Sequence, residues 1–83
     1  MAIDRNEIKA RLNKVFCEVF DDDSIVIYDE MTAKDIPEWD SLMNVSLVVA
    51  AEKEFGVSLN AVEIGHLKNV GEMIDLFQKR LIG

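Results

Sequence analysis

The chain has 83 residues, of which 16 are acidic and nine are Lys or Arg, so its formal net charge is -7. This length fits one domain with a modest core, and 49% hydrophobic residues are too many for a disordered acidic segment. The negative balance argues against nucleic acid and anionic membranes as partners, and it favours proteins with basic patches. We therefore expect residues 1–83 to form a single domain.

The acidic charge is concentrated in one segment. Residues 18–40 hold nine acidic side chains against one base, Lys34. The single cysteine, Cys17, excludes an internal disulfide and a cysteine-based zinc site, and it is consistent with a reducing compartment. The sequence has neither an apolar run long enough to span a bilayer nor the apolar core of a signal peptide, so we expect a cytoplasmic protein.

The first predicted helix covers residues 3–20. Asp4 followed by Glu7 is typical of a capping box at its start. Cys17 lies almost opposite the apolar face of this helix, so we expect its thiol to face solvent. The apolar face recurs at helical spacing and consists of Ile8, Leu12, Val15, Phe16 and Val19.

Residues 21–40 are predicted to form a long connection. Its apolar stretch at residues 25–28 could be a strand, but the sequence offers no second strand to pair with it. We therefore expect a loop that lays side chains on the core. Pro37 excludes a continuous helix into the next element.

The second predicted helix covers residues 41–55, with Asp40 as its N-cap and Gly56 as a left-handed C-cap. A short third helix is expected near residues 60–66. The last helix begins after Asn69, where Glu72 would complete another capping box. Its apolar face consists of Val70, Met73, Ile74, Phe77 and Leu81. The predicted fold is all-α, a small four-helix bundle with three main helices, a short third helix and a long first loop.

The second helix has two apolar faces. A small bundle needs only one of them for packing, so the helix is either buried all round or exposes one face to a partner. We favour the exposed face, because Ser46, Glu52 and Lys53 on that side are expected to be solvated. The packing face consists of Leu47, Val48, Ala51 and Phe55. The other face consists of Leu42, Val45 and Val49.

The segment that contains this helix and its two ends resembles the second helix of acyl carrier proteins. It reads Trp39-Asp40-Ser41-Leu42, then Val45, then Leu47-Val48, then Glu52-Lys53-Glu54-Phe55, and it ends with Gly56-Val57. The resemblance implies that Ser41 receives a 4′-phosphopantetheine arm from coenzyme A through a phosphopantetheinyl transferase. Acyl intermediates would then be carried as thioesters, and the protein itself would perform no catalysis. A serine hydroxyl at a helix start projects into solvent, and a phosphodiester there is stabilised by the helix dipole.

The resemblance also implies roles around Ser41. Asp40 and Leu42 would complete the attachment motif recognised by the transferase, and Asp40 is a plain N-cap as well. Trp39 is more typical of specialised carriers, or it holds the loop against the core. A hydrophobic staple would need an apolar residue at position 44, where the sequence has Asn44. Acyl-loading and acyl-transferring enzymes with basic or apolar docking patches are the further expected partners. The predicted docking residues are Trp39, Leu42, Val45, Ser46, Val49, Glu52 and Lys53.

Departures from the family pattern favour a specialised fatty acid, polyketide or other lipid or acylation pathway. Met43, Ser46 and Lys53 stand where acidic residues are common, which should change partner specificity more than the fold. Ala51 stands where a larger aliphatic residue is frequent, and this either enlarges an acyl pocket or lets helices approach closely. Two alternatives stay open: a peptidyl or aminoacyl carrier, and a helical interaction module that never carries an arm.

Two other motifs fail. An EF-hand loop starting at Asp21 would need Gly at position 26 and Glu at position 32, where the sequence has Val26 and Thr32. A hydrolytic triad of Ser41, His66 and an acid lacks the Gly-x-Ser-x-Gly elbow, so His66 is expected at the surface. We therefore expect no catalytic residues and no metal site, and we favour a solvated charge run over loose divalent-cation binding for Asp21–Asp23. We also expect a monomer.

Overall fold

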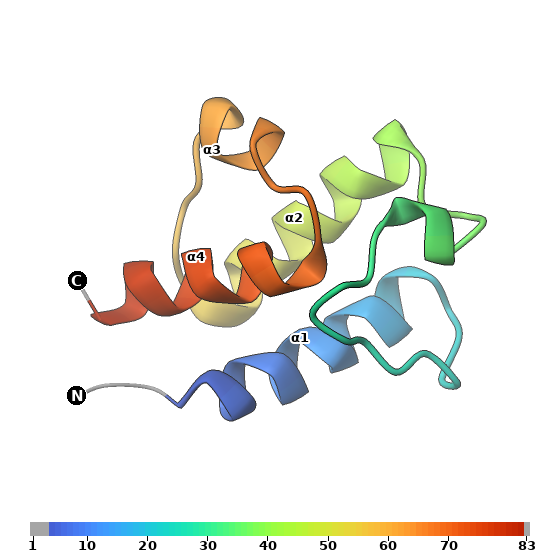
Figure 1. The fold of residues 1–83 in the computed structure, drawn as a ribbon, viewed down its shortest axis with the longest axis horizontal. Helices are drawn as coiled ribbons and strands as arrows, with labels where there is room; N and C mark the ends of the chain where they lie inside the picture. Colours follow the sequence, from blue (N-terminus) through green and yellow to red (C-terminus); the bar gives the residue numbers. More distant parts are fainter. Residues whose placement is uncertain (1–3, 83) are drawn as a thin grey trace.

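The computed structural model describes residues 4–82, apart from the side chains of Ser41, Ala61 and Ile82. Over this range the chain forms α1 (Arg5–Val19), a 3₁₀ turn η1 (Ala33–Asp35), α2 (Ser41–Phe55), α3 (Ala61–Gly65) and α4 (Val70–Ile82), and the described part contains no strand (Figure 1). The all-α four-helix prediction is confirmed. The predicted helix start at residue 3 lies outside the described residues, and η1 was not predicted.

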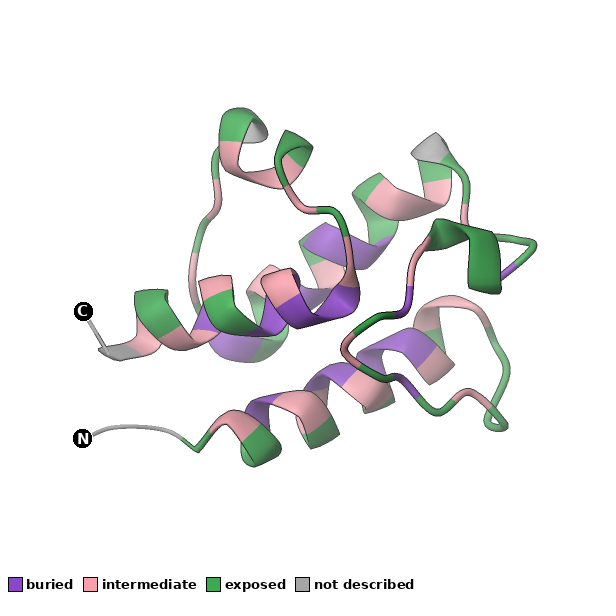
Figure 2. Cartoon of the chain, viewed as in Figure 1, coloured by how far each residue is buried: buried purple, intermediate pink, exposed green. Residues whose placement is uncertain are grey.

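Helix α1 packs against both α2 and α4, and the three helices turn their apolar faces inward (Figures 1 and 2). All three predicted packing faces line this core, where only Val19 and Leu81 keep part of their surface exposed. The rings of Phe55 and Phe77 join α2 to α4 with their centroids 4.8 Å apart. The core side chains of the three helices are Ile8, Leu12, Val15, Phe16, Leu47, Val48, Ala51, Phe55, Val70, Met73, Ile74 and Phe77.

Local hydrogen bonds fix the helix ends. The Asp4 carboxylate accepts from the Asn6 amide at 2.9 Å, so Asp4 caps α1, but the predicted return bond from Glu7 is not formed within the described residues. At α4, the Asn69 side chain accepts from the Glu72 amide at 2.9 Å. The Glu72 carboxylate accepts from the Lys68 amide, one residue before the position that a capping box uses.

The long connection packs against α1. Ile27 is buried in the core and Ile25 is half-buried, which confirms a loop that lays side chains on the core. Asn13 of α1 holds this loop at two points: its side-chain oxygen accepts from the Ile27 amide at 2.7 Å, and its Nδ2 donates to the Ile25 oxygen at 3.1 Å.

The prediction that Cys17 faces solvent is wrong. Its Sγ is half-buried, 3.6 Å from both the backbone oxygen of Ile25 and the side-chain nitrogen of Asn13. The reason is tertiary: the loop folds over the face of α1 that its own periodicity left polar. The thiol is therefore part of the contact between loop and helix.

Candidate functional site

Ser41 is the first residue of α2, where the chain changes from extended to helical backbone. Asp40 is the N-cap: its Oδ1 accepts from the Met43 amide at 2.8 Å, and its backbone oxygen accepts from the Asn44 amide at 2.9 Å. At the other end, Gly56 adopts the left-handed conformation with φ 67°. Both predicted caps are confirmed. The predicted direction of the Ser41 hydroxyl lies outside the described side chains.

The two apolar faces of α2 separate cleanly. Leu42, Val45 and Val49 are 75%, 60% and 44% exposed, so this face does not pack in the core. Ser46 and Lys53 are exposed as well. The interpretation that α2 is buried all round is therefore wrong. We call Leu42, Val45 and Val49 the exposed apolar strip; it starts one residue after Ser41.

Glu52 does not join this solvated surface as predicted. Its side chain is partly buried, and its Oε2 accepts a hydrogen bond from the Leu59 amide at 2.6 Å. The segment after Gly56 turns back along the end of α2 and brings the Leu59 amide to the carboxylate. Glu52 thus ties the connection before α3 to α2, whereas Lys53 beside it stays exposed.

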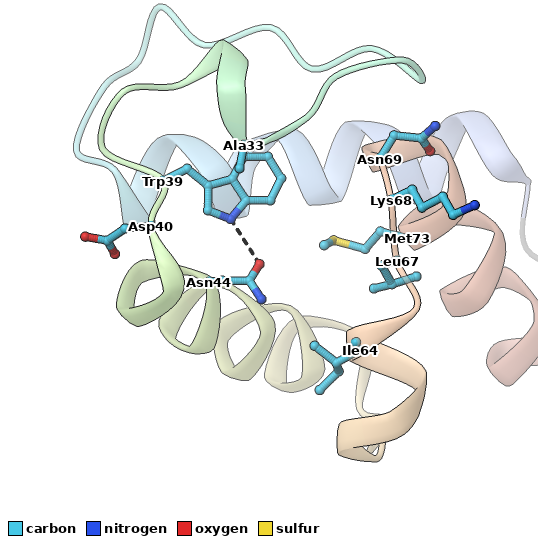
Figure 3. A pocket seen from close by; sticks show the side chains of 10 residues that line it. Ala33, Trp39, Asp40, Asn44, Ile64, Leu67, Lys68, Asn69 and Met73 are labelled. Carbon is cyan, nitrogen blue, oxygen red and sulfur yellow. Dashed lines mark hydrogen bonds between the residues drawn. The ribbon is translucent and has the colours of Figure 1, made fainter.

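Trp39 pins the approach to Ser41 onto the core. Its ring meets Phe16 edge-on with centroids 5.3 Å apart, and it lies 6.3 Å from the ring of Phe20. Its Nε1 donates to Oδ1 of Asn44 at 3.0 Å (Figure 3). Asn44 occupies the position at which a hydrophobic staple needs an apolar residue, and a side-chain hydrogen bond replaces that staple. This pairing was not predicted from the sequence, in which Asn44 is only a mismatch to the staple pattern.

A pocket of about 450 Å³ lies between the start of α2, η1 and the α3–α4 connection (Figure 3). Asp40 is among its lining residues, so the pocket reaches the residue beside Ser41. Its apolar wall comes from Trp39, Ile64, Leu67 and Met73. Its polar side includes Asn44, Lys68 and Asn69. Lys68 and Asn69 were not predicted as site residues, because they lie far from Ser41 in the sequence, in the connection between α3 and α4.

The acidic charge lies before α2 and not on its first turn, which contains no acidic residue. Asp35, Glu38 and Asp40 are exposed on the approach to Ser41. Within the Asp21–Asp23 run, hydrogen bonds from the Ser24 hydroxyl and amide to the Asp22 carboxylate lower its pKa. Across the described residues no three His, Cys, Asp or Glu side chains gather as metal ligands would.

Glu63 holds α3 to the end of α4. Its carboxylate contacts the Arg80 guanidinium and accepts from the Asn60 amide at 3.3 Å. The bond from Arg80, followed by the bond from Asn60, lowers the pKa of Glu63 despite some loss of solvation. This ion pair joins α3, which carries the pocket residue Ile64, to the last turn of α4. His66, the C-cap of α3, is exposed as predicted.

The fold and site define a small helical domain that presents a serine at a helix start, with an exposed apolar strip and a pocket beside it. No helix in the described part is long and apolar enough to cross a membrane.

No protein-family model matches the chain. The acyl carrier protein of Acidothermus cellulolyticus is 36% identical over 75 residues, which cover 90% of this chain and 89% of that protein. The acyl carrier protein of Phenylobacterium zucineum is 30% identical over 92% of this chain and 96% of that protein. A solution NMR structure of holo acyl carrier protein from Geobacter metallireducens has a TM-score of 0.83 and 43% identity, covering 90% of this chain and 85% of that one. The chain belongs to the acyl carrier protein family.

Proposed function

We propose that this protein carries acyl intermediates as thioesters on a 4′-phosphopantetheine arm attached to Ser41. The observation that carries the proposal is the position of Ser41 as the first residue of α2, directly after the N-cap Asp40 and before the exposed Leu42. A phosphodiester at this position would lie at the positive end of the α2 dipole. Membership of the acyl carrier protein family and the likeness to a holo acyl carrier protein support it.

The attachment is a phosphoryl transfer from coenzyme A. The Ser41 oxygen forms a bond to the phosphorus that bears the pantetheine, and the bond from that phosphorus to adenosine 3′,5′-bisphosphate breaks. The hydroxyl proton is taken up by a base of the transferase or by solvent. The distal thiol of the arm then exchanges acyl groups with partner enzymes, so the chain is a substrate of these enzymes.

We infer that partner enzymes dock on the exposed apolar strip, with Ser46 and Lys53 at its edge. Exposed apolar side chains on one face of a helix commonly mark a docking surface for another protein. The acidic approach that ends at Asp40 would steer basic patches toward Ser41. Because the first turn of α2 has no acidic residue, we propose that the protein serves specialised partner enzymes. Polyketide synthesis and dedicated acylation are among the candidate pathways.

The test is an intact-mass measurement after incubation with coenzyme A, Mg²⁺ and a broad-range phosphopantetheinyl transferase. We expect the mass to rise by one arm in the native chain and to stay unchanged in Ser41→Ala. Ser58→Ala changes an exposed serine beyond the C-cap of α2 and outside the exposed apolar strip; it is the matched control and should gain the arm. Absence of a mass gain with several transferases would overturn the proposal.

The exposed apolar strip also supports a second candidate, a helical interaction module without an arm. In that case Ser41→Ala should bind the partner as well as the native chain does, and neither should gain mass with coenzyme A. A peptidyl or aminoacyl carrier would gain the same arm, and loading by an adenylating enzyme with an amino acid separates it from an acyl carrier.

A further inference from the structure

We propose that Asn44 makes this carrier selective for acyl chains that bear a carbonyl oxygen, such as oxoacyl groups, over unsubstituted chains of the same length. The inference rests on the proposed attachment of the arm to Ser41. It adds a cargo class and a specificity-determining residue, and it follows from the hydrogen-bonding state of the pocket next to Ser41.

The orientation of the Asn44 amide is fixed by its neighbour. The indole Nε1 of Trp39 is a donor only, so the atom that it meets at 3.0 Å must be the oxygen of Asn44. Trp39 is itself held by Phe16 and Phe20, so this bond has a rigid anchor. The Asn44 Nδ2 therefore points away from the indole, toward the side of the pocket formed by Ile64 (Figure 3). Among the described side chains, no acceptor pairs with this nitrogen.

The other polar groups of the pocket reinforce this bias toward donors. The Asn69 oxygen already accepts from the Glu72 amide at 2.9 Å. The Asp40 carboxylate accepts from the Met43 amide and points away from the other labelled side chains in Figure 3. The Lys68 ammonium, at the outer edge, is a further donor. The side-chain oxygens of Asn44 and Asn69 and the Oδ1 of Asp40 thus each accept a bond from the protein, whereas the Asn44 nitrogen and the Lys68 ammonium can donate to an occupant.

The chemical consequence is a preference among occupants. Trp39, Ile64, Leu67 and Met73 can bury the hydrocarbon of either chain. An unsubstituted chain, however, would displace water from Nδ2 without replacing its hydrogen bond, whereas a carbonyl oxygen would accept one. One net hydrogen bond corresponds to a difference in occupancy on the order of threefold to tenfold.

The experiment loads the protein with octanoyl or 3-oxooctanoyl arms from the corresponding acyl-coenzyme A, using the broad-range transferase. Cleavage of each thioester by hydroxylamine is compared with cleavage of the same acyl-pantetheine free in solution, which gives a protection factor. We expect the protection factor of the oxo chain to exceed that of octanoyl by about threefold to tenfold. The Asn44 side-chain amide signals should also shift in the NMR spectrum with the oxo chain.

Asn44→Asp is the decisive variant, because its carboxylate still accepts from Trp39 and has no N–H to donate. We expect the ratio of the two protection factors to fall to about one or below. Asn60→Asp makes the same change at the N-cap of α3, outside the pocket, and should keep the native ratio. If Asn44→Asp fails to fold, the NMR shift in the native chain still decides.

Equal protection of both cargoes in the native chain would overturn the inference. An Asn44 amide shift that is already complete with the unacylated arm would overturn it too, because the arm's own amide carbonyls would then be the acceptors. Both outcomes require successful loading and leave the proposed function standing. Failure to load any arm rejects the proposed function instead, so the two failures are distinguishable.

Discussion

The backbone oxygen of Asp29 accepts a hydrogen bond from the Gly71 amide at 2.9 Å, which joins the long loop to the start of α4 backbone to backbone. The Met31 oxygen accepts from the Val70 amide at the same distance. Two amides that have no acceptor within their own helix are satisfied in this way by the loop. The Asp29 carboxylate also meets Arg5 at 2.9 Å. Burial opposes the ionised form, but the bonds and charges of Arg5 and Lys9 together lower its pKa.

Gly71→Ala should destabilise the protein, although alanine is the better helix former. A Cβ at Gly71 would lie 3.0 Å from the Asp29 oxygen and 3.2 Å from its Cβ. Crowding of a packed backbone costs about 1–3 kcal/mol, against about 1 kcal/mol gained from helix propensity. We expect the free energy of unfolding in urea to fall by about 1 kcal/mol. Gly65→Ala, where a Cβ meets nothing within 4 Å, should leave stability unchanged or raise it, and equal effects would contradict the argument.

Asn13→Ala should loosen the loop from α1. Both ends of the Asn13 amide are used, one by Ile25 and one by Ile27. Removal of a partner from a buried backbone group costs about 1–3 kcal/mol, so we expect a loss of stability in that range. Hydrogen exchange at the Ile27 amide should accelerate. The control is Asn6→Ala on the same helix, which is exposed and should change stability by less than about 0.5 kcal/mol.

Acidification should weaken the attachment of α3 to the end of α4. The pKa of Glu63 is lower in the folded protein than its usual value of 4.5, chiefly because of Arg80. The carboxylate therefore stabilises the fold fully above about pH 4.5, and this contribution is lost as the pH falls through the lowered pKa. We expect the Asn60 and Val62 amide signals to shift in that window. In Glu63→Gln this transition should disappear; its persistence would assign it to another carboxylate.

Asp40→Asn should separate capping from charge at the attachment site. An asparagine oxygen can still accept from the Met43 amide, so the N-cap and the stability should be retained within about 0.5 kcal/mol. If the transferase reads the negative charge, arm transfer should slow by about tenfold, measured as the initial rate of mass gain. Asp23→Asn, an exposed site in the loop, should load at the native rate. Native loading by Asp40→Asn would show that only the cap matters.

Val49→Asp should impair docking without disturbing the fold. Val49 belongs to the exposed apolar strip, so a charge there changes stability little but places an unpaired carboxylate in a desolvated interface. We expect loading by the partner enzyme to slow by at least tenfold, with helical circular dichroism unchanged. Val26→Asp makes the same change at a 76% exposed loop residue and is the control. Unchanged kinetics for Val49→Asp would exclude the strip as a docking surface.

Local chemistry made much of this fold predictable. The helix bounds follow from caps that act within three residues, as at Asp40, Gly56 and Asn60. The buried faces follow from helical periodicity, which also revealed the second apolar face of α2 before its exposure was known. The attachment motif is local as well, so Ser41 could be proposed from sequence.

Which polar side chains form hydrogen bonds depends on the tertiary structure. Cys17 is covered by a loop that passes over it, and Glu52 is drawn to the Leu59 amide. The orientation of the Asn44 amide depends on Trp39, whose indole packs against Phe16 of α1. The pocket is completed by Lys68 and Asn69 from the α3–α4 connection. Periodicity reports which face of a helix is apolar, but a hydrogen bond depends on where distant segments cross it. The helices and the candidate attachment serine therefore follow from local sequence patterns, whereas the chemistry of the pocket beside that serine follows from the packing of the long loop and α3.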